Sequence, residues 1–236
     1  MSITKLLVAN RGEIAIRIMR AAAELGIASV AVAPEDDEPS LHTRKADEAH
    51  RLPGAGAPAY LDVDAIVEAA RATGCDAVHP GYGFLSENPA LARACAEAGI
   101  TFVGPSADLL ELFGDKTRAR EAAAAAGVPI LPGTERATNL EEAHAFFAGL
   151  ADGASMILKA RAGGGGRGVR VVAAADEIDD AYERASSEAA AAFGNGDLYV
   201  EQFVAHARHV EVQIAGDGEA IVDFGERDCS IQRRHQ

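Results

Sequence analysis

Hydrophobic and polar positions follow two different periods along the first half of the chain, and they predict strands and helices in turn. Short apolar runs bounded by turn residues are typical of buried strands, whereas apolar residues three and four positions apart are typical of amphipathic helices. The predicted strands cover residues 5–9, 28–33, 76–79 and 101–103. The predicted helices between them cover residues 14–25, 62–73 and 88–98. Strands that alternate with helices at this spacing predict an α/β domain with a doubly wound parallel sheet.

Two polar segments follow strands of this predicted sheet. Residues 10–13 come directly after the first strand, and residues 79–83 begin at the end of the third. In doubly wound sheets, the groups that bind ligands gather at the carboxyl ends of the strands. We therefore expect both segments to lie near a ligand.

The pattern changes near residues 114–116, where we place a boundary. Beyond it, the predicted helices cover residues 117–126, 139–150 and 176–192, and the predicted strands cover residues 155–160, 169–172 and 198–204. Residues 209–215 and 220–224 alternate like two antiparallel strands joined by a turn. We interpret the alanine runs at residues 122–126 and 189–192 as a compositional bias without structural meaning.

The segment between the strands at 155–160 and 169–172 has the strongest chemical signal. Residues 163–166 are consecutive glycines, and Lys159, Arg167 and Arg170 flank them. Glycine backbone approaches ligands closely, and successive N–H groups in such loops can bind anions. The pattern predicts a flap that closes over a polyphosphate, with a plain surface turn as the alternative. The G-x-G-x-x-G spacing in this loop does not indicate a dinucleotide site, because a strand follows it and not a helix.

Charge and cysteine content exclude several classes of function. The formal net charge of −14 argues against nucleic acid as a partner, although a local cationic pocket can still bind a nucleotide. We find no apolar stretch long enough to span a bilayer and no signal peptide, so we expect no membrane partner. The three cysteines form no C-x-x-C pair. An odd count of isolated thiols fits a reducing compartment, and we predict a cytoplasmic protein.

Three segments stand out as motifs: residues 9–15 (ANRGEIA), 79–88 (HPGYGFLSEN) and 226–236 (ERDCSIQRRHQ). They resemble the biotin carboxylases, the ATP-grasp subunits or domains of biotin-dependent acyl-CoA, pyruvate and urea carboxylases. The resemblance implies a Rossmann-like N-terminal domain at residues 1–113 with a parallel sheet. It also implies an α+β ATP-grasp lid at residues 114–204, and the first strands of the ATP-grasp central domain at residues 205–236.

The resemblance also implies roles for single residues. Lys116 and Lys159 match lysines that bind the phosphates of ATP, and Glu201 matches the carboxylate that accepts from the adenine amino group. Tyr82 and Glu87 match the loop that faces the biotin pocket. The remaining matches are His235, for which we predict a catalytic role, and the ATP-binding residues Gly163, Gly164, Gly165, Gly166, Arg167, Gly168, Gln202, Phe203, Val204, His209 and Gln232.

Each of these side chains also has an interpretation without a ligand. Lys116 can be a solvated lysine, although the helix dipole disfavours a cation at a helix start. Glu201 can lie exposed at a sheet edge, and His209 can lie at the surface. His235 can belong to a run of surface charges, and Tyr82 to an ordinary turn.

Two departures from the family pattern are present. Residues 161–162 are Arg-Ala where many members have Ser-Gly, and we expect this to change the stiffness of the flap. The family's Mg²⁺-binding glutamates, its base for bicarbonate and its biotin-binding arginine lie downstream of the last motif. We therefore predict no metal ligand in this chain. We expect it to be the N-terminal half of a catalytic unit, inactive alone.

The function implied is carboxylation of carrier-bound biotin by MgATP and bicarbonate through carboxyphosphate, which we assign to the α subunit of an acyl-CoA carboxylase in fatty acid metabolism. The implied partners are a biotin carboxyl carrier domain and a carboxyltransferase subunit, with a homodimer at full length. One alternative is a ligase similar to carbamoyl-phosphate synthase, which passes carboxyphosphate to ammonia. The other is a non-catalytic nucleotide-binding or assembly module.

Overall fold

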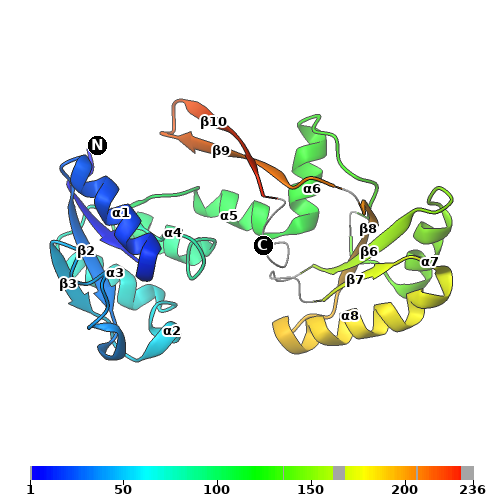
Figure 1. Ribbon diagram of the computed structural model, residues 1–236, viewed down its shortest axis with the longest axis horizontal. Helices are drawn as coiled ribbons and strands as arrows, with labels where there is room; N and C mark the ends of the chain where they lie inside the picture. Colours follow the sequence, from blue (N-terminus) through cyan, green and yellow to red (C-terminus); the bar gives the residue numbers. More distant parts are fainter. Residues whose placement is uncertain (1, 135, 162–167, 206, 230–236) are drawn as a thin grey trace. The chain divides into compact units, whose positions relative to one another are not determined.

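The computed structural model describes residues 2–134, 136–161, 168–205 and 207–229. The chain divides into two compact units, Met1–Gly114 and Asp115–Gln236, and each is described by itself. Figure 1 labels the helices and strands of both units.

The first unit is built on a parallel sheet of five strands in the order β3-β2-β1-β4-β5. The strands are β1 (Lys5–Val8), β2 (Ala28–Ala33), β3 (Glu48–Arg51), β4 (Ala77–His79) and β5 (Thr101–Phe102). After β3, the chain returns to pair β4 with the other side of β1. The loops after β1 and β4 therefore meet at a topological switch point, where doubly wound sheets bind ligands. The predicted α/β fold with a parallel sheet is confirmed.

Helices cover both faces of this sheet, because successive side chains of a strand point to opposite faces. Leu6 and Val8 pack in one cluster with helix α1 (Gly12–Glu24). Leu7 packs in a second cluster with helices α3 (Val63–Ala72) and α4 (Pro89–Glu97). The unit also contains α2 (Gly56–Ala59), α5 (Ala107–Gly114) and the 3-10 turn η1 (Glu35–Asp37).

Four of these elements were not predicted from the sequence: η1, β3, α2 and α5. Strand β3 is at the sheet edge, and its side chains are exposed or half-buried, so it has no apolar run to mark it. Helix α2 has only four residues and contains a proline, so it carries no amphipathic period.

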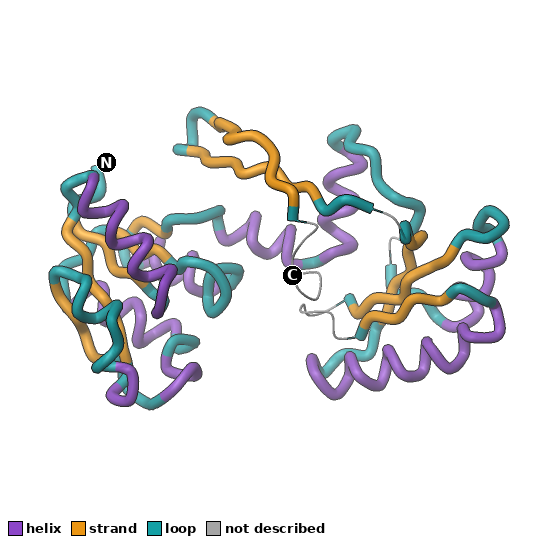
Figure 2. The backbone as a smooth tube through the Cα atoms, in the orientation of Figure 1, coloured by secondary structure: helices purple, strands orange, loops and turns teal. Residues whose placement is uncertain are grey.

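The second unit contains an antiparallel sheet of three strands in the order β7-β6-β8. Strands are drawn in orange in Figure 2. Its strands are β6 (Ser155–Ala160), β7 (Val169–Val172) and β8 (Leu198–Phe203). Helix α8 (Ile178–Phe193) packs on one face, where Met156 and Leu158 are buried, and α7 (Leu140–Ala148) adds Ala143 to the same core. A 3-10 turn, η2 (Ala175–Glu177), precedes α8.

The alanines of α8 have a structural role, so our interpretation of alanine as a compositional bias was wrong here. Ala185 and Ala189 are fully buried in the core. An ideal Cβ placed on Gly168, which precedes β7, would lie 3.2 Å from the Ala189 Cβ and 3.5 Å from the Ala185 carbonyl oxygen. Small side chains are therefore needed where this helix meets the sheet.

The second unit also contains helix α6 (Lys116–Ala125) and an antiparallel hairpin of β9 (Val210–Gly216) and β10 (Ile221–Asp228). The hairpin exposes apolar side chains that are between 46% and 77% accessible: Val210, Val212, Ile214, Ile221, Val222 and Phe224. Among the helices of the described ranges, none is both long and apolar enough to cross a bilayer.

Candidate functional site

A buried carboxylate held by two cations is the main charged feature of the second unit. Glu201 lies on β8, and its side chain is only 9% exposed. Its Oε2 atom accepts from Lys159 Nζ at 2.5 Å, and its Oε1 atom accepts from Arg120 Nη1 at 2.6 Å. A buried carboxylate needs such partners, because transfer of an unpaired charge out of water is very unfavourable.

The strand register brings Lys159 and Glu201 together. Lys159 on β6 is opposite Tyr199 on β8, and Glu201 is two residues further along the same face. Long side chains reach such diagonal neighbours across a sheet. Alternate residues of β6, such as Leu158, point into the core on the opposite face. Tyr199 is buried beside the charges, and its burial raises the pKa of its hydroxyl, which stays protonated.

Lys116 adds a second lysine to this cluster. It is the first residue of α6, directly after Asp115, which caps the helix by accepting from the N–H groups of Thr117 and Arg118. Partial burial lowers the pKa of Lys116, and the nearby charge of Lys159 lowers it further. Two lysine ammonium groups that repel each other are a suitable site for a polyanion, which relieves that repulsion.

The segment that follows Glu201 comprises the last two residues of β8 and Val204. The Gln202 N–H donates to the Pro132 carbonyl at 2.9 Å. Val204 follows β8 directly and is 42% exposed. Phe203 is half-buried at the end of the strand.

The structure places only some of the other predicted nucleotide residues. Gly168 is buried directly before β7. His209 is exposed just before β9, and its carbonyl accepts from the Cys229 N–H at 2.7 Å. The remaining predictions lie outside the described residues: Gly163, Gly164, Gly165, Gly166, Arg167, Gln232 and His235.

Sequence reasoning missed Arg120, the second partner of Glu201. Arg120 lies four residues after Lys116 in α6, so both project from the same face of that helix. This spacing was the available signal. It was hidden because the predicted helix began at residue 117, after Lys116, and its many alanines drew no attention to a charged face.

A second candidate site lies in the first unit, at the switch point of the parallel sheet. A cavity of about 400 Å³ is lined by residues from the loop after β1, the start of α1 and the loop after β4: Asn10, Arg11, Gly12, Glu13, Ile14, Tyr82, Gly83 and Phe84. The Asn10 amide donates to the carbonyls of Pro80 and Tyr82, which ties the two loops together. The predicted ligand segments thus meet in space.

Tyr82 is 61% exposed at this cavity, and its hydroxyl donates to the Glu13 carboxylate. That hydrogen bond raises the pKa of the tyrosine hydroxyl. Phe84 has a φ of 42°, a conformation that non-glycine residues rarely adopt and that is concentrated at functional sites. Glu87 is exposed further along the same loop and is not among the residues that line the cavity.

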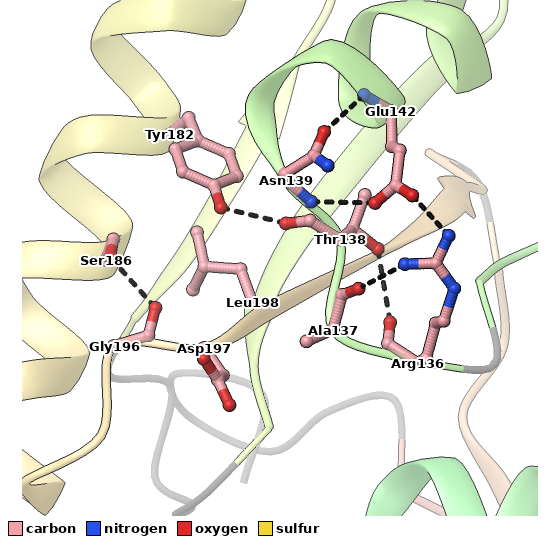
Figure 3. A pocket seen from close by; sticks show the side chains of 10 residues that line it. All are labelled: Arg136, Ala137, Thr138, Asn139, Glu142, Tyr182, Ser186, Gly196, Asp197 and Leu198. Atoms are coloured by element: carbon pink, nitrogen blue, oxygen red, sulfur yellow. Dashed lines mark hydrogen bonds and ion pairs between the residues drawn. The ribbon is translucent and has the colours of Figure 1, made fainter.

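A cavity of similar size, about 410 Å³, lies in the second unit between α7, α8 and the start of β8 (Figure 3). Several of its polar groups are already paired with one another. The Tyr182 hydroxyl donates to the Thr138 carbonyl, and the Ser186 hydroxyl donates to the Gly196 carbonyl, each at 2.8 Å. Asn139 and Glu142 form a capping box at the start of α7. We therefore assign no ligand to this cavity.

Two family descriptions together match most of the chain. Residues 2–110 match biotin carboxylase, N-terminal domain, and residues 115–236 match carbamoyl-phosphate synthase L chain, ATP binding domain. The chain belongs to the biotin carboxylase family. The resemblance of its three sequence motifs to that family is thereby confirmed.

Curated relatives support the membership of the chain in the biotin carboxylase family. Pyruvate carboxylase of Bacillus subtilis is 52% identical over 238 residues, which cover all of this chain and 21% of that protein. Biotin carboxylase 1 of Bacillus subtilis is 49% identical over 237 residues, which cover 99% of this chain and 52% of that protein. The chain thus spans about a fifth of the pyruvate carboxylase and about half of the biotin carboxylase.

Solved biotin carboxylases have the same fold. The biotin carboxylase domain of Hydrogenobacter thermophilus 2-oxoglutarate carboxylase aligns with a TM-score of 0.93 at 45% identity, over 100% of this chain and 52% of that one. That protein was solved as a dimer with MgADP, ADP and bicarbonate. Biotin carboxylase of Campylobacter jejuni aligns with the same TM-score at 42% identity, over 100% of this chain and 53% of that one.

Proposed function

We propose that this chain forms the nucleotide-binding part of a biotin carboxylase, which uses ATP and bicarbonate to carboxylate biotin on a carrier domain. The observation that carries the proposal is the cluster of Lys116, Lys159 and Glu201, which joins two lysines to a buried carboxylate. Phosphate oxygens accept hydrogen bonds from lysine ammonium groups, and a carboxylate accepts a hydrogen bond from an exocyclic amino group. Carboxyphosphate forms when a bicarbonate oxygen attacks the γ-phosphorus and ADP leaves.

In this proposal, Lys116 and Lys159 neutralise the negative charge on the phosphates, including the charge that shifts between them during phosphoryl transfer. Glu201 accepts from the adenine amino group, and the segment Gln202–Val204 lies along the edge of the base. Gly163 to Gly168 close over the phosphates, with His209 and Gln232 near the ribose and phosphates and His235 near the reacting centre. Tyr82 and Glu87 face the biotin.

The described residues do not fit a Mg²⁺ site, because no three His, Cys, Asp or Glu side chains among them form a group suited to a metal. We therefore derive no step through the metal.

We propose the domain limits expected from the sequence, with the N-terminal domain at residues 1–113, the lid at 114–204 and the central domain from 205. The exposed apolar side chains of the β9–β10 hairpin support assigning it to a further domain.

The biological setting is also part of the proposal. The partners are a biotin carboxyl carrier domain, a carboxyltransferase and a second copy of the complete protein, in the cytoplasm. The molecule that finally receives the carboxyl group from biotin stays a prediction. The relatives and solved structures include pyruvate carboxylases, a 2-oxoglutarate carboxylase and a long-chain acyl-CoA carboxylase. Assignment to the α subunit of an acyl-CoA carboxylase is therefore one of several options.

A carbamoyl-phosphate synthase reaction is the second candidate, because the match over residues 115–236 is to an ATP-binding domain described from that enzyme. The match of residues 2–110 to the biotin carboxylase N-terminal domain favours biotin as the acceptor. The two candidates differ in the acceptor that stimulates ATP cleavage, which is biotin in one case and ammonia in the other.

The proposed function predicts that the complete protein containing this chain releases phosphate from ATP when magnesium, bicarbonate and biotin are all present. Omission of bicarbonate is the control. Stimulation by ammonia but not by biotin would favour the carbamoyl-phosphate reaction. We expect the 236-residue chain alone to show no bicarbonate-dependent cleavage, and turnover by it would contradict its assignment as an incomplete catalytic unit.

The lowered pKa of Lys116 predicts that nucleotide binding takes up protons at alkaline pH. Near that lowered pKa, part of the free protein has a neutral Lys116, and bound phosphate raises the pKa and restores the proton. ADP affinity should therefore fall as pH rises through the lowered pKa. Calorimetric titration of the complete protein in buffers of different ionisation enthalpy measures the uptake. Uptake that persists unchanged in Lys116→Met would show that another group is responsible.

A further inference from the structure

Arg120 is the fixed partner of Glu201. Its Nη1 atom donates to the Glu201 carboxylate and its Nη2 atom donates to the Leu131 carbonyl, both at 2.6 Å. The Arg120 side chain is only 15% exposed. A guanidinium group held at both ends in a mostly buried position has little freedom to leave the carboxylate.

The backbone next to Arg120 strengthens this arrangement. The Pro132 carbonyl accepts from the Gln202 N–H at 2.9 Å, and Gly133 forms a β-bridge with Glu201. An ideal Cβ on Gly133 would lie 2.9 Å from Arg120 Nη2 and 3.0 Å from Glu201 Cγ. The close approach of this backbone therefore confines the guanidinium and the carboxylate together.

Lys159 is the more exposed partner of Glu201. Its side chain is 30% exposed, twice the fraction for Arg120, and it carries its charge on a flexible stem. When Lys159 turns towards a phosphate group, Glu201 Oε2 loses its hydrogen-bond donor while Oε1 keeps Arg120. The carboxylate then has one oxygen that can accept a hydrogen bond from a ligand.

We propose that Arg120 is a positioning residue for the nucleotide base, an inference that rests on the proposed function and extends it. Arg120 balances the charge of Glu201 and fixes its orientation while Lys159 serves the phosphates, so that Oε2 accepts an N–H from the base. An ionised carboxylate accepts hydrogen bonds and donates none. The arrangement thus selects a base with an amino group at this edge over one with a carbonyl, such as adenine over hypoxanthine.

The test compares ATP with inosine triphosphate as substrates of the complete protein. Without Arg120, Glu201 is held less firmly, so Arg120→Met should raise KM for ATP by about tenfold or more. KM for inosine triphosphate should rise much less, because hypoxanthine presents a carbonyl there. The kcat at saturating ATP should be nearly unchanged. Arg120→Lys, which keeps the charge but cannot reach both acceptors in the same way, should give an intermediate preference.

Arg118→Met is the matched control, because Arg118 is an exposed arginine of the same helix. It should leave the ratio of the two KM values unchanged. Equal rises in both KM values for Arg120→Met, or no rise, would overturn the role of Arg120. If Arg120→Met does not fold, a wild-type ratio in Arg120→Lys would overturn it. An unmodified protein without ATP-dependent biotin carboxylation would refute the proposed function as well.

Discussion

Replacement of Lys159 with methionine in the complete carboxylase should weaken ADP binding by about 10- to 150-fold, the equivalent of a hydrogen bond to a charged group. Methionine keeps a stem of similar length and removes the ammonium group. In the proposed site, the phosphates then lose a direct counter-charge. Titration calorimetry of the variant and the unmodified protein measures the difference.

The fold should survive this substitution, because the Glu201 carboxylate keeps its second cation, Arg120, at 2.6 Å. The loss of Lys159 also removes a like charge near Lys116, so the pKa of Lys116 should rise towards its ordinary value. Proton uptake on ADP binding should therefore shrink in the same variant. Both effects come from a single ammonium group.

Lys45→Met is the control for a general effect of lost positive charge, because Lys45 is an exposed lysine of the first unit. It should leave ADP affinity unchanged. Unchanged affinity in a folded Lys159→Met variant, with measurable binding in the unmodified protein, would contradict the placement of phosphate at Lys159.

Replacement of Gly168 with alanine should destabilise the second unit by about 2–5 kcal/mol, the sum of backbone strain and overpacking. Gly168 has a φ of +66°, which a Cβ disfavours. The added Cβ would also lie 2.9 Å from the Ala160 Cβ and 3.2 Å from the Ala189 Cβ. Both neighbours are buried in the core, so neither has room to move away.

Gly194→Ala separates the two causes. Gly194 has a φ of +73° at the end of α8, and an added Cβ would meet no atom within 4 Å. This control variant should lose only the stability that corresponds to backbone strain, about 1–2 kcal/mol. Hydrogen exchange of the Ala160 amide, which donates to the Gly168 carbonyl at 2.9 Å, measures the local stability. Equal losses in the two variants would show that the close packing at Gly168 contributes nothing.

The amino-acid sequence determined the elements with a clear hydrophobic period. Strand β2 has the bounds expected from its apolar run, and α3 begins after Asp62, which accepts from the Ala65 N–H. Alternation of strands with helices was sufficient to predict the parallel sheet. Each helix returns the chain to the end of the sheet where the previous strand began, so the next strand runs in the same direction. The glycine loop and the lysine before it led to the prediction of a polyphosphate site, and that assignment stays a prediction.

Only the tertiary structure decided which side chains meet. Glu201 was open to interpretation as an exposed edge residue. Its burial between Lys159 and Arg120 depends on strand register and on helix α6, which carries Arg120 81 residues before Glu201. The edge strand β3 was invisible for a related reason, because its side chains contribute little to the core and so carry no pattern. A hydrophobic pattern reports which residues are buried. It does not report their partners, because pairing between distant segments depends on how whole elements pack.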